Sequence, residues 1–158
     1  QRKHHNLTPP CENYGSSKLP DGKSNPQKYG GADAFLQFMT DTVYHFVISS
    51  TFPRISVCQT ALFGHSFGAL FALHAVYTAP VSFDAYLAAS PSSWWNDGFL
   101  LQVEKQFYNM PESPHQPSVW MAYGALEQSP VPQKNQSLEE YEKRLAIAKE
   151  RLMGDSCD

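Results

Sequence analysis

The fold is decided by the stretch Thr60-Ala61-Leu62-Phe63-Gly64-His65-Ser66-Phe67-Gly68-Ala69-Leu70-Phe71-Ala72-Leu73. Its apolar start predicts the end of a strand, and residues 69–77 are apolar on most sides, which predicts a buried helix. Between these two elements lies the pentapeptide at 64–68, a G-x-S-x-G pattern. A strand and a helix joined by this pattern form a sharp turn with the serine at its tip.

The predicted turn gives Ser66 the position that a catalytic nucleophile needs. A serine hydroxyl is a weak nucleophile until a base takes its proton, so it must lie clear of the sheet. Small residues at Gly64 and Gly68 are expected to relieve crowding between turn, strand and helix. The amide of Phe67 is expected to point at the developing oxyanion, helped by the helix N-terminus. The alternative is an ordinary strand-to-helix turn in which Ser66 is an N-cap.

Outside this stretch, helical and strand-like patterns alternate, after a Pro-, Gly-, Ser- and Asn-rich segment at 1–30 that predicts a loop. We predict a helix from Asp33 to Thr51, strands at 55–63, 83–89 and 118–123, and helices at 69–77, 97–108 and 137–153. The last helix starts with a capping-box pattern, Ser137 and Glu140. This alternation predicts an α/β fold, with a parallel sheet of about three strands flanked by helices. Sheets average about five or six strands, so the sheet is expected to be incomplete.

Composition excludes several classes of protein. The chain has 158 residues, enough for one domain, and a net charge of −3 with no Lys/Arg block, so we expect neither nucleic acid nor a membrane as partner. It contains no apolar run of membrane-spanning length and no signal-peptide pattern, and its three cysteines form no disulfide framework. We therefore expect a cytoplasmic protein. No metal-binding or phosphate-binding motif is present, so no metal and no cofactor are expected.

Residues 61–73 resemble the esterase branch of the α/β hydrolases, which includes the enterobactin and bacillibactin siderophore esterases and S-formylglutathione hydrolase (esterase D). Residues 30–36 and 83–95 agree with the siderophore esterases in particular, and the resemblance covers most of residues 2–127. The family often has Gly-Gly where this chain has Gly68-Ala69, a minor change because Ala is a good helix former. The resemblance implies a partial α/β-hydrolase fold.

The resemblance also implies further site residues. Glu127 resembles the family's catalytic acid, which would orient the base, although some siderophore esterases are described as using a Ser–His pair alone. The alternative is a solvated loop glutamate. Trp94 and Trp95 are expected to stack on a catechol or hydroxamate group, or else to anchor a packed loop. Arg2, followed by Leu7-Thr8-Pro9, is expected to hold an anionic iron–siderophore, or else to be a frayed terminal residue.

The base of such a site is missing from its expected place. In this fold the triad runs Ser, then acid, then His, and no histidine follows Glu127. His115 and the other five histidines (His4, His5, His45, His65 and His74) lack the chain order of a base. We therefore expect residues 1–30 to be the N-terminal segment of a truncated domain. Residues 31–158 are expected to be the central and C-terminal part of that domain, without its first strands and its histidine segment.

Two functions remain open from the sequence. The first is a serine esterase that hydrolyses ester bonds of siderophores or related small acyl esters through an acyl-enzyme, with the 158 residues alone inactive. The second is a non-catalytic, hydrolase-like binding protein.

Overall fold

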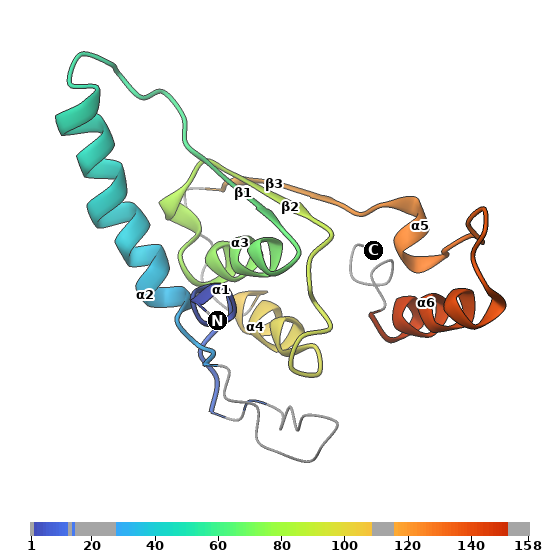
Figure 1. The fold of residues 1–158 in the computed structure, drawn as a ribbon. Coiled ribbons are helices and arrows are strands. Elements are labelled where there is room, and N and C mark those ends of the chain that lie inside the picture. Colours follow the sequence, from blue (N-terminus) through green and yellow to red (C-terminus); the bar gives the residue numbers. More distant parts are fainter. Residues whose placement is uncertain (1, 13, 15–27, 109–115, 152–158) are drawn as a thin grey trace.

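A three-stranded parallel sheet lies at the centre of the molecule (Figure 1). The computed structural model describes residues 2–12, 14, 28–108 and 116–151. Its strands are β1 (Ala61–His65), β2 (Ala85–Ala89) and β3 (Ser118–Ala122), paired in the order β1-β2-β3. Helices α3 (Phe67–Thr78) and α4 (Phe99–Tyr108) connect them and lie on the same side of the sheet. The predicted α/β fold, with about three parallel strands, is confirmed.

Helix α3 forms the core, because every residue from 69 to 76 is buried. Leu62 of β1 and Tyr86 of β2 belong to one buried cluster with Phe71, and Ala88 of β2 belongs to a second buried cluster with Leu70. A helix that is apolar all round, as the sequence predicted here, must be covered on all sides.

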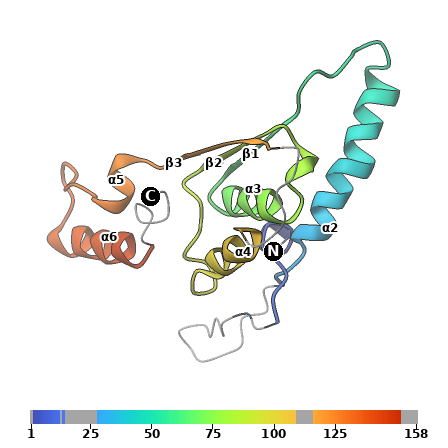
Figure 2. The ribbon, with the colours of Figure 1, turned by 180° about the vertical axis from the view of Figure 1, so that it is seen from behind.

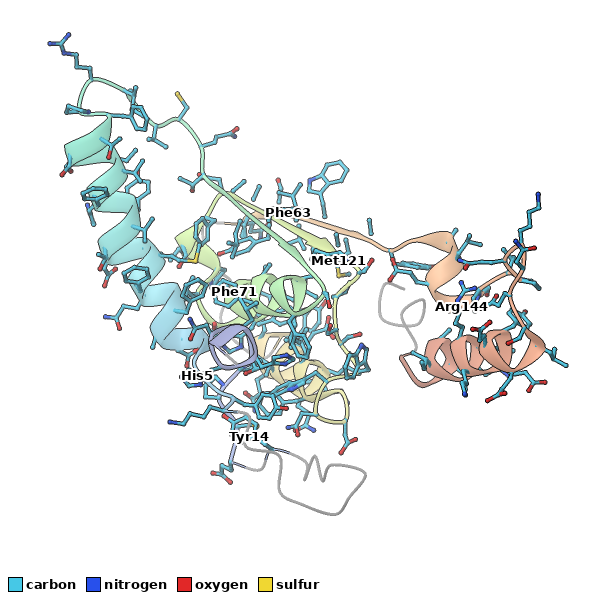
Figure 3. All side chains as sticks on the ribbon, viewed as in Figure 1. His5, Tyr14, Phe63, Phe71, Met121 and Arg144 are labelled. Carbon is cyan, nitrogen blue, oxygen red and sulfur yellow. The ribbon has the colours of Figure 1, made fainter. Side chains whose placement is uncertain are left out.

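On the face of the sheet opposite α3, no described helix covers the strands. Side chains alternate along a strand, so Phe63, Leu87 and Trp120, which are neighbours in register, all point to this face. Their exposed fractions are 68%, 37% and 69%. Figure 3 shows Phe63 on the side of the sheet away from α3 and Phe71 on the helix side.

The predicted helix from Asp33 to Thr51 is present as one continuous helical stretch. It starts as α2 (Ala32–Gln37) and continues in wider π-type turns, η1 (Phe38–Tyr44) and η2 (Phe46–Thr51). Its second half extends away from the sheet, as Figure 2 shows from behind. Gly31, not Asp33, is the residue before its first turn.

Most boundaries differ from the sequence-based prediction by one or two residues, and two segments differ by more. The predicted strand at 55–63 pairs only from Ala61, opposite Ala85, the first residue of β2. Just before the ladder, the carboxylate of Asp84 accepts hydrogen bonds from the Thr60 amide (2.7 Å) and hydroxyl (3.0 Å). The predicted loop at 1–30 contains a short helix, α1 (Arg2–Asn6). The Thr8 hydroxyl closes its end by donating to the carbonyl oxygens of His4 and His5.

Two helices follow β3 and lie apart from α3 and α4 (Figure 1): α5 (Ala125–Gln128) and α6 (Leu138–Arg151). The predicted capping box is confirmed, since Glu140 accepts from the Ser137 amide at 3.0 Å and the Glu140 amide donates to the Ser137 hydroxyl at 3.2 Å. The hydrogen bond from the Ser137 amide lowers the pKa of the Glu140 carboxyl.

A 3-10 turn, η3 (Pro80–Ser82), precedes β2.

Candidate active site

Ser66 lies at the tip of the turn between β1 and α3, in a backbone conformation that serine rarely adopts. Its φ is 57° and its ψ is −117°. The Ser66 amide donates to the carbonyl of Ala89 at 3.0 Å, and its carbonyl accepts from the amides of Ala69 and Leu70. These contacts hold the strained conformation from both sides. Such strain is characteristic of the predicted strand–turn–helix arrangement.

The two glycines of the pentapeptide have different roles. A Cβ added to Gly64 would lie 1.9 Å from the carbonyl oxygen of Gly68, so only glycine fits at position 64. A Cβ added to Gly68 would have no neighbour within 4 Å. The expected relief of crowding therefore applies to Gly64 and not to Gly68.

Phe67 is the first residue of α3. Amides in the first turn of a helix have no partner within the helix, so the Phe67 amide is available to a ligand at this end. Ser66 makes no side-chain capping bond to this helix, which disfavours the reading of Ser66 as an N-cap. The ring of Phe67 packs edge-on against Trp94, with 6.0 Å between ring centroids, and against His4, with 4.9 Å.

The Ser66 hydroxyl is hydrogen-bonded to Ser92. The two Oγ atoms are 3.1 Å apart, and Ser92 is 2% exposed. The sequence reasoning missed Ser92. Its only signal was its place in the Ser90-Pro91-Ser92 segment, directly after a strand that neighbours the one before the turn.

Glu127 follows β3 at the same end of the sheet. Its Oε1 accepts hydrogen bonds from the Ser90 hydroxyl at 2.6 Å and from the Gly124 amide at 2.8 Å. The Ser90 amide in turn donates to the carbonyl of Ala122, the last residue of β3, at 2.6 Å. Ser66, which follows β1, and Glu127, which follows β3, thus lie at the same edge of the sheet, because the carboxyl ends of parallel strands share one edge.

The two tryptophans have different environments. Trp94 is 37% exposed and lies beside Phe67, whereas Trp95 is 6% exposed and packs against Phe99 and Tyr29. The side chain of Arg2 lies outside the described part of the structure. Of the two tryptophans, only Trp94 is partly exposed near Ser66.

None of the histidines among the described residues is hydrogen-bonded to Ser66. His74 is buried and its Nε2 lies 2.6 Å from the carboxylate of Asp33, which links α3 to α2. His5 Nδ1 lies 2.9 Å from the carbonyl oxygen of Tyr29, and the Nδ1 atom of His4 is buried without a hydrogen-bond partner. His45 and His65 are exposed. His115 lies outside the described residues.

Two further features of the described residues bear on function. Their His, Cys, Asp and Glu side chains form no group of three or more that could hold a metal ion. No helix within the same part of the chain has both the length and the apolar character needed to cross a bilayer.

Comparisons with known proteins agree with this geometry. The family described as "Putative esterase" matches residues 10–155. The siderophore enterobactin esterase of Emericella nidulans is 46% identical over 160 residues, which cover 99% of this chain and 52% of that protein. The siderophore triacetylfusarinine C esterase of Aspergillus fumigatus is 41% identical over 133 residues, 83% of this chain and 45% of that protein.

A solved structure is similar as well. The siderophore hydrolase EstA from Aspergillus nidulans aligns with a TM-score of 0.89 at 46% identity, over 99% of this chain and 52% of that chain. The chain therefore spans about half the length of the curated relatives it matches.

Proposed function

Because the chain belongs to this esterase family, we propose that it carries the nucleophile, an oxyanion amide and the acid of a serine esterase that acts on siderophore esters. The observation that carries the proposal is the strained turn at Ser66, which presents a hydroxyl beside the first amide of a buried helix. Ser66 Oγ attacks the ester carbonyl, and the Phe67 amide stabilises the oxyanion. Water then hydrolyses the acyl-enzyme and releases the acid.

Glu127 is proposed as the acid that orients the base. Its carboxylate is fixed by two hydrogen bonds at the edge of the sheet that holds Ser66. The base is proposed to be a histidine outside residues 1–158, because no histidine among the described residues is hydrogen-bonded to Ser66 and no histidine follows Glu127 in the sequence. The chain would then be the central and C-terminal part of a hydrolase domain.

The proposed substrates are siderophores or related small acyl esters, because relatives are named as esterases of enterobactin and triacetylfusarinine C. Trp94 is partly exposed beside Phe67, and its aromatic ring can stack on a flat catechol or hydroxamate group. Arg2 is proposed to attract the negative charge of an iron–siderophore complex. Iron enters as part of the substrate.

The test uses the complete protein, by which we mean the product of its complete coding sequence. Wild type and Ser66→Ala are assayed with p-nitrophenyl acetate and with ferric enterobactin, with Ser82→Ala as a serine control at the opposite end of the sheet. We expect Ser66→Ala to lose at least about 10³-fold in kcat. Unchanged turnover in Ser66→Ala would contradict the proposal.

Residues 1–158 expressed alone are expected to show no Ser66-dependent turnover, because a triad without its base loses about 10⁴- to 10⁶-fold in rate. Within the part of the chain that the structure describes, no histidine is hydrogen-bonded to Ser66, which also favours a second function, a non-catalytic protein that binds siderophores. Fluorophosphonate labelling of the complete protein distinguishes the two: an esterase is labelled at Ser66, and a binding protein is not.

A further inference from the structure

Ser92 contacts the atom that would react. It lies 26 residues after Ser66, and the two hydroxyl oxygens are 3.1 Å apart. Ser66 Oγ is the hydrogen-bond partner of the Ser92 hydroxyl among the described residues. Because a buried hydroxyl without a partner is costly, this contact fixes where the Ser92 side chain points.

The backbone around Ser92 is held rigidly. The Ser92 amide donates to the Ser66 carbonyl at 3.2 Å, and the Ser92 carbonyl accepts from Trp95 at 3.0 Å. Ser90 has a φ of 47°, and Pro91 and Ser92 are almost completely buried. The Ser92 hydroxyl is therefore positioned before any substrate binds, which is the condition for efficient electrostatic stabilisation.

We infer that Ser92 is a catalytic hydrogen-bond donor to Ser66 Oγ, stabilising the negative charge that develops on this oxygen. The inference rests on the proposed function. For attack, Ser66 must give its own proton to the base, so its oxygen is left to accept a hydrogen bond from the Ser92 hydroxyl. Hydrogen bonds to a charged oxygen are roughly twice as strong as those to a neutral one, so the contact strengthens as the proton leaves.

The same donor acts in both halves of the reaction. In acylation, Ser66 Oγ loses its proton to the base and forms a bond to the acyl carbon, and the carbonyl π electrons move to the oxyanion. The oxyanion then re-forms the carbonyl, and the alcohol leaves with its bonding electrons and takes the proton from the base. In deacylation, water attacks the acyl carbon and gives a proton to the base. The carbonyl π electrons move to the oxyanion as water adds. They return as Ser66 Oγ leaves with the bonding electrons and takes that proton, while Ser92 again stabilises its charge.

Two substitutions separate this role from packing. Ser92→Ala removes the donor and leaves a small cavity. Ser92→Cys fills the space but offers only a weak S–H donor. Both are compared with wild type, Ser82→Ala and Ser66→Ala in the complete protein, by kcat and KM for p-nitrophenyl acetate, by the rate of fluorophosphonate labelling, and by the urea midpoint of unfolding.

We expect Ser92→Ala and Ser92→Cys both to lose about 10- to 100-fold in kcat and in labelling rate, with KM within about 2-fold of wild type. Ser82→Ala should match wild type. Wild-type kcat in Ser92→Cys would overturn the inference, since it would mean that Ser92 only fills space. If Ser92→Ala fails to fold, Ser92→Cys alone decides. Full activity in Ser66→Ala would overturn the proposed function and this inference together. Loss in Ser66→Ala with normal kcat in both Ser92 variants would overturn only the inference.

Discussion

The hydroxyl of Ser90 donates a hydrogen bond to the carboxylate of Glu127, with 2.6 Å between Oγ and Oε1. The two residues are 37 positions apart in the chain and follow neighbouring strands, β2 and β3. With the Gly124 amide as a second donor, this contact fixes the direction in which the carboxylate points. An acid that orients a catalytic base depends on such fixation.

Ser90→Ala in the complete protein is expected to lower kcat about 10-fold and to leave KM within about 2-fold, because it removes one hydrogen bond to a charged group. Glu127→Gln should lower kcat further, by about 10²- to 10⁴-fold. The exposed Ser129, two residues after Glu127, provides the control Ser129→Ala. Wild-type kcat in Glu127→Gln would instead support a Ser–His pair without an acid.

Gly64 and Gly68 should respond differently to the same substitution. Gly64→Ala places a methyl group 1.9 Å from the Gly68 carbonyl oxygen and is expected to destabilise the fold by about 3 kcal/mol or more. Gly68→Ala meets open space at the start of a helix and is expected to stabilise the fold by up to about 1 kcal/mol. Urea unfolding of the two variants measures both effects. Equal stability of the two would contradict the crowding seen at the turn.

Trp94 and Trp95 should separate binding from stability. Trp95→Ala removes a buried side chain from the core and is expected to cost about 3–5 kcal/mol in the free energy of unfolding. Trp94→Ala removes a partly exposed ring and is expected to raise KM for ferric enterobactin several-fold with little change in the urea midpoint. A Trp94→Ala variant with unchanged KM would remove Trp94 from the proposed substrate contacts.

Tyr86 should make stability depend on alkaline pH. Its side chain is fully buried, and this burial raises its pKa from 10.0 to about 12. The folded state therefore holds the phenol proton more tightly than the unfolded state does. The resulting stabilisation, on the order of 2 kcal/mol, is complete below pH 10 and is lost as pH rises towards about 12.

The measurement for Tyr86 compares the urea midpoint at about pH 8 and pH 11 in wild type and Tyr86→Phe. We expect the urea midpoint to fall less between the two pH values in Tyr86→Phe than in wild type. The variant is less stable at pH 8, because it lacks the hydrogen bond from the phenol to the Ala79 carbonyl. The exposed Tyr123 gives the matched control Tyr123→Phe. The same fall in Tyr86→Phe as in wild type would show that Tyr86 does not carry the effect.

The turn at Ser66 could be predicted from sequence because its signals are local: two glycines, an apolar strand and an apolar helix within 14 residues. The parallel sheet could be predicted for the same reason, because the alternation of strand and helix patterns is also visible locally in the sequence. The start of β1 could not be predicted, since the β-branched Ile55 and Val57 favour a strand but lie before the point where β2 begins to pair.

The contacts around the site were less predictable. Ser92 reaches Ser66, and Ser90 reaches Glu127, only because the strands pair in a particular register, and no local pattern reveals a register. The tryptophans illustrate a second limit. Two identical neighbours in a loop carry the same sequence signal, yet one is packed in the core and the other is partly exposed.

The parallel arrangement of the strands also separates the two ends of the sheet. Ser66, Ser92 and Glu127 lie where the strands finish, while the exposed Cys58 precedes β1 at the ends where they begin. A fluorescent dye attached to this thiol, after Cys11 and Cys157 are replaced, would follow unfolding without standing in the path of an incoming ester. The fold thus offers a built-in attachment point whose chemistry is independent of the reacting edge.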